Sequence, residues 1–269
     1  GIALSRWAEL IKGKEPEEAR KKYEKAIECY DKALEINPNY AKAWNNKGVA
    51  LSKLRRYEEA IECFDRALEI NPNDAKAWYN KGNALYRLER YEEAIECYDN
   101  ALEINPNDAE AWNNKGATLS KLRRYEEAIE CYDNALEINP NYAEAWNNKG
   151  NALDELGRYG EAIGCYDNAL EINPNYAEAW YNKGYVLGKL GRHEEAIECF
   201  DRALEINPND AKAWYNKGNA LYRLGRYEEA IECYDNALEI NPNDAKAWNN
   251  KGVALSKLRR YEEAIECFD

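Results

Sequence analysis

Residues 41–74 alternate between apolar and polar positions in a pattern typical of two consecutive helices. In the first, Trp44 and Leu51 share one side of a helix expected from about Ala43 to Leu54, with small residues between them. In the second, apolar residues from Ala60 to Ile70 recur at i, i+1, i+4, i+7, i+8 and i+10, which forms a single apolar stripe. The pattern therefore predicts a pair of helices and no strand.

Two short segments punctuate this pair. Residues 55–57 are expected to form the turn between the helices, with Glu58 in the first turn of the second helix, where negative charge suits the helix dipole. Pro72 ends the second helix because proline lacks a backbone N–H, and Asn73 or Asp74 can then cap the next helix. The unit is helix–turn–helix–turn.

The same unit recurs with a fixed period along most of the chain. Seven tryptophans mark it at intervals of 34 residues: Trp44, Trp78, Trp112, Trp146, Trp180, Trp214 and Trp248. A period of this length indicates a stack in which each unit buries its apolar face against its neighbours. We therefore expect function on an extended surface rather than in one deep pocket.

The spacing of the recurring residues resembles the tetratricopeptide repeat, and the matching set in the first copy is Trp44, Gly48, Ala60, Phe64, Ala67 and Pro72. The resemblance implies an all-α fold, a right-handed α-solenoid superhelix of antiparallel helix pairs. We expect a divergent repeat at 1–40, whose longer second helix has Pro16 in its first turn. Complete repeats are then expected at 41–74, 75–108, 109–142, 143–176, 177–210 and 211–244, with a truncated repeat at 245–269.

Composition narrows the setting. The chain has 269 residues and a net charge of −13, which disfavours general affinity for nucleic acids. No apolar stretch is long enough to cross a membrane. The eight cysteines occupy one position of successive repeats, too far apart for disulfides and without the spacing of a zinc site. Unpaired thiols favour a reducing compartment, so we expect a cytoplasmic protein with no cofactor or metal.

Every repeat from residue 41 onward carries a lysine immediately before the glycine four residues after its tryptophan, where the tetratricopeptide pattern usually has leucine. We expect each lysine stem to cover the packed layer while its ammonium meets a carboxylate of a second helix. These lysines are Lys47, Lys81, Lys115, Lys149, Lys183, Lys217 and Lys251.

The second residue after each tryptophan is always asparagine, and we call these seven residues the asparagine ladder: Asn46, Asn80, Asn114, Asn148, Asn182, Asn216 and Asn250. Each costs a helix about 0.5 kcal/mol relative to alanine. Two explanations are open. The amides can bind the backbone of an extended peptide, as the resemblance to the ladder of O-linked N-acetylglucosamine transferases implies, or each can bond to a neighbouring helix.

In tetratricopeptide repeats the first helices line the concave face, so the resemblance implies a peptide-binding groove there. Besides the ladder, the residues expected to line it are Lys76, Tyr79, Asn83, Asn151, Tyr181, Tyr185, Lys212, Tyr215 and Asn219. The tyrosines can instead pack between adjacent first helices. Acidic residues concentrate in repeat 143–176, with basic stretches on either side. A ligand with acidic ends would complement that distribution.

The clamp with which some members of this family grip chaperone tails is incomplete. Asn151, Asn182 and Lys212 match three of its five positions, but Asn147 and Asn216 stand where the clamp has basic residues. Chaperone-tail binding is therefore disfavoured.

Catalysis has little support in the sequence. His193 is the only histidine and replaces a tyrosine of the other repeats, so we expect it to be structural. The cysteines have no histidine partner to activate them. We therefore expect a non-enzymatic scaffold that binds a peptide or protein ligand.

Two alternatives remain open. Basic and aromatic residues interleave on the first helices, as they do in proteins that bind single-stranded RNA. Apolar residues near both ends also predict end-to-end self-association, which would suit a structural array: Ile2, Leu4, Leu10, Leu255, Leu258, Ile265 and Phe268.

Overall fold

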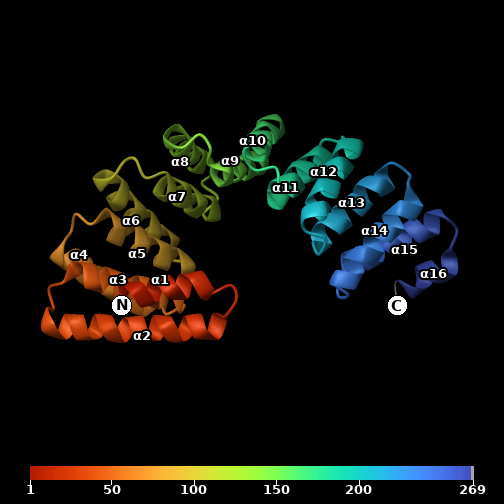
Figure 1. Cartoon of the computed structure of the whole chain (residues 1–269). Coiled ribbons are helices and arrows are strands. Elements are labelled where there is room, and N and C mark those ends of the chain that lie inside the picture. The colour runs from red at the N-terminus through yellow and green to blue at the C-terminus, as the bar shows by residue number, and fades with distance from the viewer. Residues whose placement is uncertain (268–269) are drawn as a thin grey trace. The chain divides into compact units, whose positions relative to one another are not determined.

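The computed structural model describes residues 1–267, and in that part of the chain the regular structure is entirely helical. The chain divides into two units, residues 1–140 and 141–269, which are described separately. In each unit consecutive helices pack as antiparallel pairs (Figure 1).

The first unit holds four helix pairs. They are α1 (Ile2–Ile11) with α2 (Pro16–Ile36), α3 (Ala41–Lys53) with α4 (Tyr57–Ile70), α5 (Ala75–Arg87) with α6 (Tyr91–Ile104), and α7 (Ala109–Lys121) with α8 (Tyr125–Ile138). The 21-residue α2 begins at Pro16, which confirms the longer second helix expected there.

The second unit repeats the arrangement. Its pairs are α9 (Ala143–Glu155) with α10 (Tyr159–Ile172), α11 (Ala177–Lys189) with α12 (His193–Ile206), α13 (Ala211–Arg223) with α14 (Tyr227–Ile240), and α15 (Ala245–Lys257) with α16 (Tyr261–Glu266). We call the first member of each pair a first helix and the other a second helix.

Helix boundaries differ from the sequence expectation by one or two residues. First helix α3 begins at Ala41 rather than Ala43, and α4 already includes Tyr57. In the next repeat the carboxylate of Asp74 accepts hydrogen bonds from the backbone N–H groups of Lys76 and Ala77, both at 3.1 Å, so Asp74 is the cap.

The turn inside each pair from α3–α4 onward contains one residue with positive φ. Non-glycine residues take this conformation at Arg55, Glu89, Arg123 and Arg259, with φ between 60° and 62°, whereas Gly157, Gly191 and Gly225 have φ between 73° and 76°. Positive φ brings the Cβ of an L-residue close to its own backbone, which glycine avoids.

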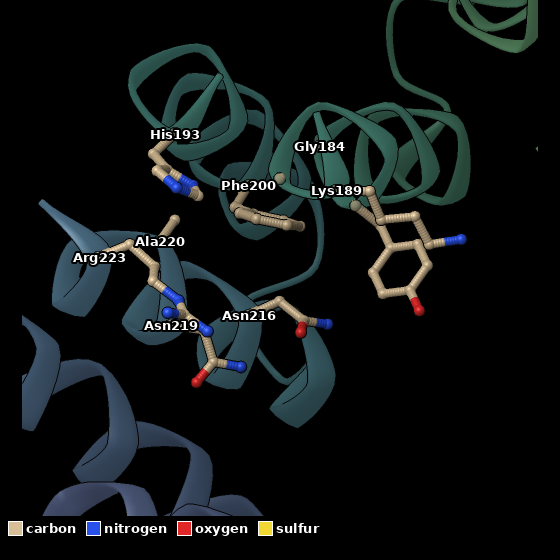
Figure 2. Close-up of a pocket in the computed structure, with 10 residues that line it drawn as sticks. Gly184, Lys189, His193, Phe200, Asn216, Asn219, Ala220 and Arg223 are labelled. Carbon is tan, nitrogen blue, oxygen red and sulfur yellow. The ribbon is translucent and has the colours of Figure 1, made fainter. Parts of the chain in front are cut away.

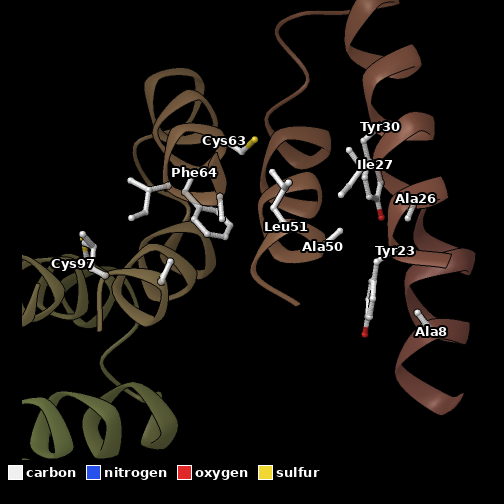
Figure 3. Packing of buried hydrophobic residues seen from close by; sticks show 14 of the residues in the cluster. Ala8, Tyr23, Ala26, Ile27, Tyr30, Ala50, Leu51, Cys63, Phe64 and Cys97 are labelled. Carbon is white, nitrogen blue, oxygen red and sulfur yellow. The ribbon is translucent and has the colours of Figure 1, made fainter. Parts of the chain in front are cut away.

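In the pairs from α1–α2 to α13–α14, the core closes around an aromatic residue of the second helix. In the first unit Phe64 and Leu51 are buried between their helices (Figure 3). A Cβ added at Gly48 would lie 2.6 Å from Cε1 of Phe64, so no larger residue fits without movement. Gly48 therefore permits the close approach of α3 and α4.

The lysines before the glycines reach carboxylates of the preceding second helix, as expected. Lys47 Nζ lies 2.6 Å from Asp31 Oδ1 and 5.5 Å from the centroid of the Trp44 ring. The same pairing recurs at Lys81, Lys115, Lys183, Lys217 and Lys251. Each lysine therefore connects two successive repeats and covers its own tryptophan.

The apolar residues near the ends are not all exposed. Leu255 is buried in the core between α14 and α15, because its own repeat and the preceding one cover it, so its assignment to an exposed edge was wrong. Leu258 and Leu4 pack partly against the core. Ile2, Leu10 and Ile265 are exposed, and Phe268 lies outside the described residues.

Candidate peptide-binding surface

The asparagine ladder lies on the first helices, and in the described structure its amides bond to the preceding first helix. Asn80 Nδ2 donates to Asn45 Oδ1 at 3.0 Å, and Asn182 Nδ2 donates to Asn147 Oδ1 at 3.1 Å. The acceptor in each case is the residue that follows the tryptophan of the preceding repeat. Asn45 and Asn147 are buried, and the sequence analysis did not single them out as acceptors.

Where that following residue is tyrosine, its hydroxyl takes the same role. Tyr79, Tyr181 and Tyr215 accept from the next ladder residue at 3.0 to 3.1 Å. Burial raises the pKa of Tyr79 and of Tyr181, which keeps these hydroxyls protonated at neutral pH. Asparagine and tyrosine therefore supply one acceptor at equivalent positions.

The ladder amides are only partly committed by these bonds. A side-chain amide carries two N–H donors and a carbonyl oxygen. Asn216 uses one donor on Tyr181, and its side chain also lines a cavity. At Asn216 both explanations of the ladder can therefore hold together. Asn114 and Asn250 differ, because each donates to two acceptors of the preceding repeat.

Three further predicted residues support buried tyrosines of their own repeat. Asn83, Asn151 and Asn219 accept hydrogen bonds from Tyr98, Tyr166 and Tyr234, at 2.8, 2.9 and 3.0 Å. Repeat 41–74 has valine and phenylalanine at the two equivalent positions, Val49 and Phe64. The two positions are not always exchanged together, because repeat 109–142 has Ala117 with Tyr132, whose hydroxyl lies 3.2 Å from Ser120 Oγ instead.

The predicted lysines at the starts of first helices are available to a ligand. Lys76 and Lys212 are exposed, and no carboxylate of the described residues forms an ion pair with either side chain. By contrast, arginines of the second helices such as Arg66 and Arg202 each pair with a glutamate at 2.7 Å. From residue 41 onward, the basic residues of the second helices are therefore paired, and the unpaired ones in helices lie on first helices.

Each unit contains a cavity lined largely by first-helix residues. In the first unit a cavity of about 480 Å³ is lined by Tyr40, Ala41, Lys42, Asn45, Asn46, Asn71, Asp74 and Lys76. In the second unit a cavity of about 220 Å³ is lined by Gly184, Tyr185, Gly188, Lys189, His193, Phe200, Asn216, Asn219, Ala220 and Arg223 (Figure 2). Five predicted site residues therefore line cavities: Asn46, Lys76, Tyr185, Asn216 and Asn219.

The sequence analysis missed part of the second cavity. It treated His193 as structural, and it did not select Gly188, although Gly188 stands where six other repeats have serine, tyrosine or aspartate. That departure from the repeat was the available signal. Tyr185, which was predicted, is 42% exposed and stacks on Tyr181 with ring centroids 6.4 Å apart.

The cysteines are poorly suited to catalysis. All eight are free, and burial raises the pKa of five thiols to about 11: Cys63, Cys97, Cys131, Cys199 and Cys233. Such thiols carry almost no thiolate at neutral pH. Residues 1–267 also show no group of three or more histidine, cysteine or acidic side chains placed to bind a metal ion.

No helix in residues 1–267 has the length and apolar character needed to cross a membrane.

Comparison with known protein families decides the identity of the fold. The tetratricopeptide repeat family matches residues 41–74, 75–108, 109–142, 177–210 and 211–244, and related repeat families match 19–55, 131–164, 150–191 and 233–266. The chain is a tetratricopeptide-repeat protein. None of the curated proteins matches it in sequence.

Solved structures of tetratricopeptide-repeat proteins resemble the chain. YrrB, described as a protein of this class with an unusual peptide-binding site, is 30% identical, with a TM-score of 0.60 over 71% of this chain and 98% of YrrB. MamA from Desulfovibrio magneticus RS-1 is 27% identical, with a TM-score of 0.57 over 60% of this chain and 90% of MamA. The Cut9–Hcn1 structure, 19% identical, matches 94% of this chain and 52% of that chain with a TM-score of 0.70, which shows the fold alone.

Together these findings support a protein-interaction scaffold. They also place the predicted residues in two classes. Five ladder asparagines and the tyrosines after the tryptophans form hydrogen bonds between repeats, and Asn83 and Asn151 bond to a tyrosine of their own repeat, while Lys76, Lys212 and Tyr185 are exposed and lack such bonds.

Proposed function

We propose that this tetratricopeptide-repeat protein binds extended peptides along its first helices. The observation that carries the proposal is the lining of the two cavities, where ladder asparagines stand beside exposed lysine or tyrosine side chains. Concave sites with a few polar groups on apolar walls are the usual places of ligand binding. The similarity to YrrB, a tetratricopeptide-repeat protein with an unusual peptide-binding site, supports the same function.

Charge indicates which peptides are favoured. The first helices carry lysines without ion-pair partners among residues 1–267, such as Lys76 and Lys212. A carboxylate of a ligand would gain a charged hydrogen bond there without displacing an internal partner. Peptides with acidic residues are therefore expected to bind more tightly than basic ones.

The test is a peptide-array binding screen with charge-reversed variants. The first-helix variant carries Lys76→Glu and Lys212→Glu, one change in each unit at equivalent positions. The matched control carries Arg66→Glu and Arg202→Glu on second helices, with the same change in net charge. We expect the first-helix variant to lose most binding to acidic peptides and the control to retain it.

Equal binding by both variants would contradict the proposal. These substitutions are preferable to changes in the asparagine ladder, since ladder variants would also remove hydrogen bonds between repeats such as Asn216 to Tyr181. Circular dichroism of both variants confirms that the helices are retained.

The two alternatives are examined by the same proteins. RNA would be favoured over peptide if a single-stranded oligonucleotide bound with an affinity that falls steeply with salt, and if only the first-helix variant lost this binding.

Self-association stays a prediction: Ile265 is 59% exposed, whereas the equivalent Ile197 and Ile231 are buried. Sedimentation velocity of Ile265→Glu beside the unmodified protein tests it, and a concentration-independent monomer for both would contradict it.

A further inference from the structure

The cavity of the second unit occupies a place that an aromatic pair fills in two other repeats. In repeat 75–108 the rings of Tyr86 and Tyr91 pack with centroids 5.6 Å apart, and in repeat 211–244 those of Tyr222 and Tyr227 pack at 5.3 Å. Repeat 177–210 has glycine and histidine at these two positions. Of these three repeats, only 177–210 has no side chain in the space that Tyr86 and Tyr222 fill.

The glycine is not required by its surroundings. A Cβ added at Gly188 would meet no atom within 4 Å, and the residue lies in the last turn of α11, one position before the helix ends at Lys189. Gly184 on the same helix is different, since a Cβ there would lie 2.9 Å from Cε1 of Phe200. Gly188 therefore keeps a cavity open rather than allowing two helices to meet.

The cavity combines apolar walls with polar groups from α11, α12 and α13. Phe200 and Ala220 supply apolar surface, while His193 and Arg223 approach from α12 and α13 (Figure 2). Nδ1 of His193 is buried and has no hydrogen-bond partner in the described structure. A buried polar nitrogen without a partner is costly, and a ligand hydroxyl that met it after a small rotation of the imidazole would remove that cost.

The charges around the cavity favour an oxygen-bearing group over a cation. Lys189 Nζ lies 2.8 Å from Asp154 Oδ1, so the charges of Lys189 and Asp154 offset each other. The same ammonium lies 4.5 Å from the centroid of the Tyr185 ring. Arg223 forms no ion pair among residues 1–267. The remaining charge at the rim is positive, which disfavours a lysine or arginine side chain of the ligand.

We propose that this cavity is a specificity pocket for a tyrosine side chain of the bound peptide. The ring occupies the space that Tyr86 and Tyr222 fill in their repeats and packs on His193, and its hydroxyl lies within reach of Nδ1 of His193 and of Arg223. The pocket rests on the proposed peptide-binding function for its biological role. Its affinity for a phenol can nevertheless be measured separately.

The single histidine of the chain provides a direct reporter. We would follow the imidazole Cε1–H resonance of His193 by NMR while adding p-cresol, the side chain of tyrosine, or toluene, which lacks only the hydroxyl. We expect a saturable shift with p-cresol and about fivefold weaker binding of toluene, because the nitrogen stays unpaired with toluene. Absence of a saturable shift with p-cresol would overturn the pocket.

Two substitutions at Gly188 make the test specific to the cavity. Gly188→Tyr restores the residue present at 86 and 222 and should abolish the p-cresol shift. Gly188→Ser introduces the residue present at 52, 120 and 256, leaves most of the space open, and should retain binding within about threefold. Equal p-cresol binding by Gly188→Tyr and the unmodified protein would overturn the proposal.

Peptide selection separates the pocket from the proposed function. Peptides selected by the unmodified protein should share one tyrosine, and this preference should vanish for Gly188→Tyr. Peptides that bind both proteins equally and show no aromatic preference would overturn the pocket while leaving peptide binding intact. Saturable p-cresol binding with no peptide bound would refute the proposed function but support the pocket.

Discussion

The turn residue at position 89 permits a clean measurement of backbone strain, because two repeats differ only there. Repeats 75–108 and 211–244 have the same sequence except for Glu89 in one and Gly225 in the other. Both residues have positive φ, 60° at Glu89 and 76° at Gly225. The protein thus contains the two states of one substitution in otherwise equivalent surroundings.

The expected gain follows from two opposing terms. A non-glycine residue at positive φ costs about 1 to 2 kcal/mol. Glycine loses about 0.5 to 1 kcal/mol more than alanine in backbone entropy when the chain folds. Glu89 is exposed, and its side chain forms no ion pair or hydrogen bond among residues 1–267, so its loss removes no favourable contact. We expect Glu89→Gly to raise the free energy of unfolding by about 0.5 to 1 kcal/mol, and Gly225→Glu to lower it by a similar amount.

The assay combines chemical denaturation with hydrogen exchange, since repeat arrays can open in parts. Guanidinium unfolding reports the whole chain, and amide protection in α5 and α6 reports the altered repeat. Glu89→Ala is the matched control, because it removes the same charge but keeps a Cβ at positive φ. The reasoning is refuted if Glu89→Ala stabilises α5 and α6 as much as Glu89→Gly does.

Three further outcomes are expected. Gly150→Ala should lower the free energy of unfolding by about 1 to 3 kcal/mol, because the new Cβ would lie 2.5 Å from Cε1 of Tyr166, whereas Gly164→Ala, whose Cβ would have no atom within 4 Å, should stabilise α10 by about 1 kcal/mol. Thermal melts should therefore shift in opposite directions, and shifts of the same sign would contradict this reasoning. Tyr166→Phe and Asn151→Val should each lower the free energy of unfolding by about 1 kcal/mol or more, while the double variant should lose less than the sum, since it leaves neither partner unpaired. A double-mutant cycle with additive losses would contradict the pairing. Hydrogen bonds from Lys12 and Tyr23 lower the pKa of Glu9 to about 2, so the stability that its carboxylate adds to the packing of α1 should be present above about pH 4.5 and lost as the pH falls towards 2. The melting temperature of Glu9→Gln should lack this pH dependence, and the same pH profile in both proteins would contradict the assignment.

The sequence was sufficient to predict the repeated architecture because each element has a local cause. The apolar stripe from Ala60 to Ile70 and the stop at Pro72 define α4, and close packing explains Gly48. The lysine–carboxylate pairs were also predicted correctly, although the partner helix belongs to the preceding repeat. A local pattern repeated many times leaves few alternatives for the fold.

The site was less predictable because its properties depend on relations between repeats. Nothing within one repeat shows that the Asn80 amide donates to the preceding first helix, since the acceptor lies 35 residues away. The tyrosine-sized cavity arises from what Gly188 lacks relative to other repeats, and a motif search looks for residues that are present. Leu255 was misjudged for the same reason: its burial depends on α14 and α15 together.

The hydrogen bonds between first helices also bear on how such an array can grow. In these bonds the donor is always a ladder asparagine. The acceptor, in the preceding repeat, is either the amide oxygen of an asparagine or the hydroxyl of a tyrosine. Either acceptor satisfies the same donor, so a duplicated repeat finds its polar contacts already matched at both junctions. Copying a repeat within the gene would therefore leave no unpaired amide at the new boundary. Identical segments such as 41–65 and 245–269 are the outcome expected of a chain whose junctions tolerate insertion in this way.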